Sequence, residues 1–122
     1  MTARADAAAP VLVAVSADPE TSHRANEAIR IALGILAGEN PVVIALLGAG
    51  AKLLDAEVED YTDGQDIARH VATFRKLGQP FHVERAAIPS GRNWNPAGLE
   101  IVPLDGADLA RLMAASRRVL VF

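Results

Sequence analysis

Two stretches decide the fold class: residues 11–35, VLVAVSADPETSHRANEAIRIALGI, and residues 41–48, PVVIALLG. Residues 11–16 and 41–48 are apolar runs without polar alternation, which is typical of strands covered on both faces. Between them apolar residues recur at helical spacing, and Asp18, Pro19 and Gly38 predict where that helix starts and ends. A strand, a helix and a second strand at this spacing predict a right-handed βαβ unit.

The rest of the chain continues this alternation. The further helical segments that we predict are one or two turns at 51–54, a helix at 65–77 and a last helix capped by Asp105. In the last helix, Leu109, Leu112 and Met113 are expected to face inward. The further strands that we predict lie at 81–88, at 99–103 with Pro103 as its end, and at 118–122. We therefore expect an α/β fold, a three-layer α/β/α sandwich around a mostly parallel sheet of about five strands.

Length and composition narrow the class of protein. A chain of 122 residues has room for one domain, which we place at 10–122 behind a frayed tail at 1–9. The 12 basic and 15 acidic residues are intermixed, which argues against a nucleic-acid partner. The apolar runs are too short for a membrane span or a signal peptide, so we expect a cytoplasmic protein without a membrane partner. The chain has no cysteine, which excludes disulfides, thiolate metal sites and a cysteine nucleophile.

Four stretches, in their order along the chain, resemble the DsrE/DsrF-like family of small sulfur-relay proteins. They are the opening strand and helix at 11–35, VVIALLGAGAKLL at 42–54, DIARHVATFRKLGQPFHV at 66–83 and DLARLMAASRRVLVF at 108–122. The resemblance implies a DsrE-like fold. Members of the family that move sulfur carry a cysteine at or just after the third long strand, where this chain reads FHVERAAIPSGRNW.

The missing cysteine removes the family's activity from this chain. A persulfide requires a thiol sulfur, which no other side chain here supplies. The resemblance then implies a non-catalytic domain that forms a homo-oligomer (dimer, trimer or hexamer) and binds a small anionic molecule or a protein partner. The alternative is a non-catalytic subunit of a sulfurtransferase complex that works beside a cysteine-bearing partner. A third hypothesis, an enzyme that uses Ser16, His82 or Glu84, has no support from spacing.

Candidate binding residues follow from the rule that ligands of parallel α/β sheets lie outside the carboxyl ends of the strands. Ser16 and Asp18 would form a polar rim there, or would only cap the next helix. Gly48 and Gly50 with Lys52 would form an anion-binding nest of backbone N–H groups, or only a tight turn. The sequence GAGAK lacks the spacing of a P-loop and of a dinucleotide fingerprint.

The loop that follows the third strand holds the other candidates. Arg85 lies near the position of the family's cysteine and would bind a ligand, form an ion pair or contact another subunit. Arg92, Asn93 and Trp94 form the most unusual cluster, because the only tryptophan stands in a polar Pro/Gly loop. Trp94 would cap a pocket while Arg92 recognises an anion, or Trp94 would anchor the loop or a subunit interface.

The sequence contains no spacing of histidine residues that is typical of a metal or cofactor site. His23, His70 and His82 lie on separate predicted elements, and none has a ligand partner at metal-binding spacing. The sequence therefore predicts no metal site, no cofactor and no catalytic constellation.

Overall fold

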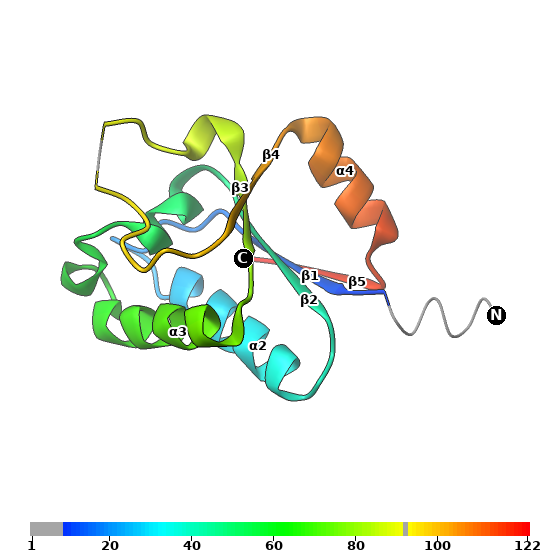
Figure 1. The fold of residues 1–122 in the computed structure, drawn as a ribbon, viewed down its shortest axis with the longest axis horizontal. Helices are drawn as coiled ribbons and strands as arrows, with labels where there is room; N and C mark the ends of the chain where they lie inside the picture. The colour runs from blue at the N-terminus through cyan, green and yellow to red at the C-terminus, as the bar shows by residue number, and fades with distance from the viewer. Residues whose placement is uncertain (1–8, 92) are drawn as a thin grey trace.

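The sheet is parallel throughout and has five strands. The computed structural model describes residues 9–91 and 93–122. The strand order is β4-β3-β2-β1-β5, so the first strand in the sequence lies between the second and the last (Figure 1). The strands are β1 (Val11–Val15), β2 (Val42–Leu46), β3 (Phe81–Glu84), β4 (Ile101–Leu104) and β5 (Arg118–Val121).

Helices cover both faces of this sheet, which gives the expected three-layer sandwich. Helices α2 (Arg24–Ala37) and α3 (Gly64–Leu77) lie on one face, and α4 (Gly106–Ala115) lies on the other (Figure 1). Three 3₁₀ segments follow strand ends or join them to helices: η1 (Gly48–Leu54), η2 (Val58–Asp60) and η3 (Arg85–Ala87). No helix within the described residues is long and apolar enough to cross a bilayer.

Strand β1 shows why both faces need a cover. All five of its residues are buried, as its unbroken apolar run predicts. Val11, Val13 and Val15 pack into the core under α2 and α3, whereas Leu12 packs with Ala45 and Leu104 on the α4 side. Because successive side chains point to opposite faces of the sheet, this single strand contributes residues to two separate cores.

The two cores differ in size and completeness. The α2/α3 core contains most of the buried apolar residues, including Phe74 and Phe81, whose rings meet edge to face at 5.2 Å. Among the described residues, the buried members of the α4 core are Leu12, Ala45 and Leu104. All ten residues of α4 are described, and none of them is buried. We call the sheet side chains on this side, together with α4, the α4 face.

Some predicted boundaries are wrong, and local chemistry explains each. Asp18 does not cap α2, which begins at Arg24; its carboxylate accepts the backbone N–H of Glu20 at 2.9 Å in a separate turn. The third strand ends at Glu84, because the backbone then coils into η3. Pro103 lies inside β4, which tolerates it because β4 is at the edge of the sheet.

One inward-facing prediction is also wrong: the side chain of Met113 is 46% exposed. Residues 1–8 of the predicted tail lie outside the described part.

Candidate functional site

The carboxyl ends of the central strands hold most of the residues that sequence reasoning selected. Ser16 follows β1, and its hydroxyl donates to the backbone carbonyl of Phe122 at 3.2 Å. Asp18 follows two residues later, and Gly48–Leu54 (η1) continues directly from the end of β2. The fold therefore brings Ser16, Asp18 and η1 to one edge of the sheet.

Lys52 forms an ion-pair cluster at this edge. Its Nζ donates to a carboxylate oxygen of Asp18 at 3.2 Å and to one of Glu20 at 2.7 Å. The N–H of Glu20 and the ammonium of Lys52 both lower the pKa of Asp18, and the two carboxylates raise the pKa of Lys52. Asp18 and Lys52 are thus neighbours, and the ammonium of Lys52 is shared between two carboxylates.

The two glycines of the predicted nest have structural tasks. The N–H of Gly48 donates to a carboxylate oxygen of Glu84 at 2.8 Å, and that of Gly50 donates to the Leu47 carbonyl at 2.9 Å. A Cβ on Gly50 would lie 2.1 Å from the carbonyl oxygen of Val15, so η1 packs against β1 too closely for any side chain. The donors expected to hold an anion are therefore engaged within the chain, which favours the tight-turn interpretation.

Arg85 lies apart from this cluster. Its Nε donates at 3.0 Å to Asp105, which precedes α4 and takes part in a capping box with Asp108. The side chains of Arg85 and Asp105 are both 61% exposed, so the pair contributes little to stability. Arg85 connects the end of β3 to α4, which agrees with the ion-pair interpretation.

Trp94 holds its loop against η1. The indole Nε1 donates to the carbonyl of Ala51 at 2.9 Å, and Trp94 forms an isolated antiparallel bridge with Asp55. The half-buried ring packs on the α2/α3 core. This geometry supports the anchoring interpretation; Asn93 is exposed, and Arg92 lies outside the described residues.

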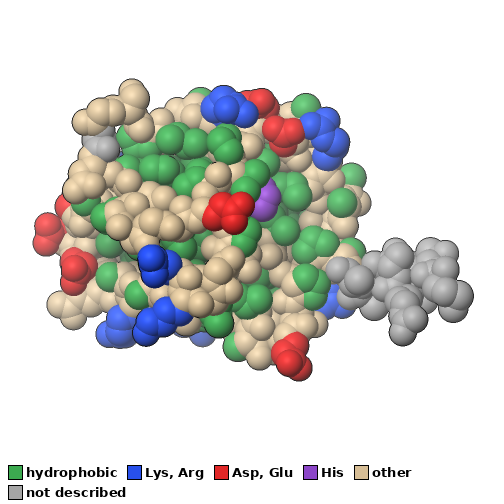
Figure 2. All heavy atoms as spheres, in the orientation of Figure 1, with side chains coloured by type: hydrophobic (Ala, Val, Ile, Leu, Met, Phe, Trp, Pro, Cys, Tyr) green, Lys and Arg blue, Asp and Glu red, His purple; other side chains and the backbone are tan. Residues whose placement is uncertain are grey.

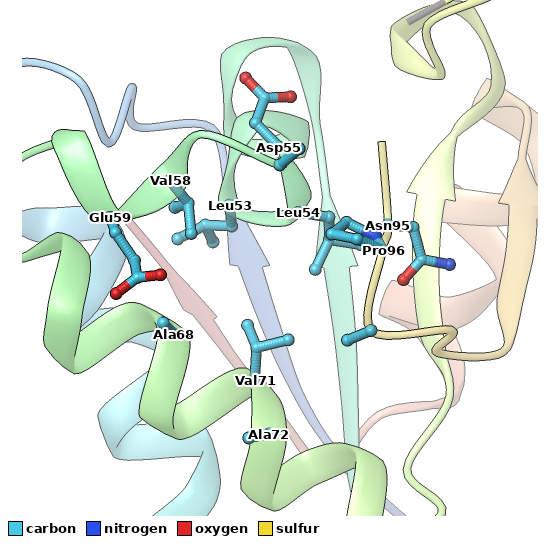
Figure 3. A pocket seen from close by; sticks show the side chains of 12 residues that line it. Leu53, Leu54, Asp55, Val58, Glu59, Ala68, Val71, Ala72, Asn95 and Pro96 are labelled. Atoms are coloured by element: carbon cyan, nitrogen blue, oxygen red, sulfur yellow. The ribbon is translucent and has the colours of Figure 1, made fainter. Parts of the chain in front are cut away.

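Beside Trp94 lies a half-open cavity of about 160 Å³ (Figure 3). Its walls come from the segment around η1 and η2, from α3 and from residues 95–97. The apolar lining side chains are mainly Leu53, Leu54, Val58, Ala68, Val71 and Ala97. Sequence reasoning missed this cavity because its walls come from three segments that share no motif.

One polar pair borders the cavity. The hydroxyl of Tyr61 donates to a carboxylate oxygen of Asp55 at 2.6 Å, and Asp55 is only 3% exposed. Burial raises the pKa of the Tyr61 hydroxyl, and the hydrogen bond to Asp55 raises it further. Tyr61 is therefore a protonated donor at neutral pH, suited to hold Asp55 in place and unsuited to act as a base.

The three histidines remain separate in space. His23 Nδ1 lies 2.8 Å from Asp63, His70 Nδ1 lies 3.1 Å from the Asn26 amide oxygen, and His82 is on β3. Within residues 9–91 and 93–122, the structure contains no group of three or more His, Asp or Glu side chains arranged to hold a metal ion.

Comparison with known proteins supports the fold and gives no information on activity. No family model matches the sequence, and no curated protein matches it significantly. Among solved structures, the ychN protein from E. coli superposes with a TM-score of 0.71 over 93% of this chain and 99% of that chain, at 13% sequence identity. That protein has a DsrE/DsrF-like fold. The chain described here thus has the DsrE-like α/β fold that its motifs predicted.

Proposed function

We propose that this chain is a non-enzymatic DsrE-like binding protein that assembles with copies of itself through its α4 face. The assembled protein would bind a small molecule or a protein partner. The observation that carries the proposal is the incomplete α4 layer. A parallel sheet is normally covered on both faces, and in the described part of the chain α4, a helix of ten residues, is the one helix on this face.

Strand β5 shows what α4 leaves bare. Val121 pairs in register with Ala14, and Val119 pairs with Leu12, so both valines share the face of Leu12. Leu12 is fully buried, whereas Val121 is 65% exposed. Met113 of α4 is also exposed, and Figure 2 shows hydrophobic side chains at the surface next to charged ones in the α4 region. A second copy that covers this face would remove apolar surface from water, which favours association.

The chemistry of the carboxyl edge supports the absence of catalysis. The chain has no cysteine, and Lys52, Asp18 and Glu84 are engaged in ion pairs or turns. The second hypothesis, a non-catalytic subunit beside a cysteine-bearing sulfurtransferase, has support from the fold alone.

The test is the mass of the protein in solution, measured by analytical ultracentrifugation from micromolar to millimolar concentration. We expect a homo-oligomer for the wild type. A double variant, Val121→Asp with Met113→Glu, should dissociate to monomers, because both charges would be buried in the interface.

Leu77→Glu is the matched control. Leu77 is 58% exposed at the end of α3, on the opposite layer, so its replacement should leave the assembly intact. A wild type that stays monomeric at millimolar concentration would refute the proposal. Equal dissociation by Leu77→Glu would show that the interface does not use the α4 face.

A further inference from the structure

We infer that the cavity between η1, η2 and α3 is a preformed site for a compact, uncharged apolar molecule about the size of benzene. An engineered apolar cavity of about 150 Å³, lined by Leu, Ile and Phe side chains, stays dry and binds benzene. The present cavity has about 160 Å³ and a mainly aliphatic lining. This inference does not depend on assembly through the α4 face.

The walls of the cavity are fixed before any ligand arrives. The N–H of Asn95 donates to the Leu54 carbonyl at 2.7 Å, and the side chain of Asn95 exchanges two hydrogen bonds with the backbone of Leu99. On the opposite wall, a Cβ on Gly64 would lie 2.2 Å from the Val58 carbonyl oxygen, so the start of α3 packs tightly against η2. Binding therefore costs little reorganisation of these segments.

The lining selects against polar and anionic ligands. Leu53, Val58 and Val71 point toward the centre of the cavity, whereas the Asp55 carboxylate points away from it (Figure 3). The Asn95 amide donates one hydrogen bond to the backbone of Leu99 and accepts one from it, so these contacts hold it against that segment. Two lining residues, Asp55 and Glu59, are carboxylates and would repel an anion. The ligand class is thus opposite to the anion that the Gly48–Lys52 motif predicted.

The experiment compares benzene with benzoate, two probes that share a ring and differ in charge. Methyl-resolved NMR of the full chain would follow the Leu53, Val58 and Val71 signals during each titration. Benzene should shift these signals to saturation. Benzoate should bind at least about tenfold more weakly, because its carboxylate would lose water next to like charges.

A filled cavity provides the second arm. Ala68→Leu places a larger side chain inside the cavity and should abolish the benzene shifts. Ala110→Leu makes the same change at an exposed position of α4 and should leave them unaltered. Thermal unfolding of both variants checks that they are folded. If Ala68→Leu does not fold, the benzene and benzoate titrations of the wild type still test the inference.

Three outcomes would overturn the inference. One is an absence of benzene shifts in the wild type, and another is benzoate binding as tight as benzene binding. The third is a set of lining signals that respond to protein concentration and not to benzene, which would mean that a side chain of another copy fills the cavity.

Discussion

The two faces of the sheet are formed by the same strands, but helices bury one face more completely than the other. On the α2/α3 face, Phe74, Ile67 and Ile29 from two helices of fourteen residues are fully buried. On the other face α4 rests through Leu109 and Leu112, which are only partly buried. The difference teaches that one chain can complete its core on one face of a sheet and leave the other face partly open to water. The following predictions test that contrast, from the largest effect to the smallest.

Phe74→Ala should cause the largest loss of stability. The ring is fully buried against Phe81, so its removal should lower the free energy of unfolding by about 3–5 kcal/mol. Urea denaturation followed by circular dichroism measures this cost. A loss below that of Leu112→Ala would contradict the ranking of the two faces.

Leu112→Ala should cost about 1 kcal/mol in dilute solution, because water already reaches part of this side chain. If a second copy covers α4, the cost should increase with protein concentration, since association stabilises the folded state by mass action. The measurement is the unfolding midpoint at micromolar and at millimolar protein. If the loss of stability is the same at both protein concentrations, α4 is not part of an interface between copies.

His82→Leu should keep stability or raise it, by up to about 1 kcal/mol. His82 Nδ1 is buried on the α4 face, and no described residue gives it a hydrogen bond. An apolar replacement removes that unsatisfied atom. The matched change on the other face, His70→Leu, should lower stability, because it removes the contact with the buried Asn26. Thermal unfolding of the two variants gives the comparison, and a destabilised His82→Leu would count against it.

The pH dependence should show the smallest effect. Burial lowers the pKa of both His70 and His82 below the ordinary value of 6.5. The unfolded chain then binds more protons, so the histidine contribution is complete above about pH 6.5 and is lost as the pH falls below it. We expect the slope of stability against pH between about pH 7 and pH 5 to be reduced in the His70→Leu, His82→Leu double variant. An unchanged slope would mean that the two histidines titrate alike in both states.

The sequence supported prediction of the strands better than of the site. Uninterrupted apolar runs predict buried strands, and β1, β2 and β5 lie where those runs are. Asp18 followed by Pro19 is also a pattern for a helix start, but the carboxylate closes a local turn at Glu20 instead. Two interactions of similar energy compete at such a position, and sequence alone does not rank them.

The candidate residues at the carboxyl edge have partners within the chain that the sequence did not predict. Lys52 and Gly48 are well chosen for an anion, but Glu20 and Glu84 reach them from other segments. Those carboxylates lie far from their partners in the sequence, so no local motif predicts the contacts. The same holds for the cavity, whose walls are brought together by the packing of α3 against η2 and by the hydrogen bond from Asn95 to Leu54.

The strand order has a consequence for how the protein is made. Strand β1 is among the first parts of the domain to be synthesised, yet one of its two neighbours is β5, the last strand. Until residues 106–121 have been translated, one edge of β1 has no parallel partner and Leu12 has no helix above it. Unpaired strand edges and bare apolar surface are what drive nascent chains to aggregate. A chain released after β4 would therefore lack α4 and β5, so β1 would be an unpaired edge of its sheet and Leu12 would be uncovered.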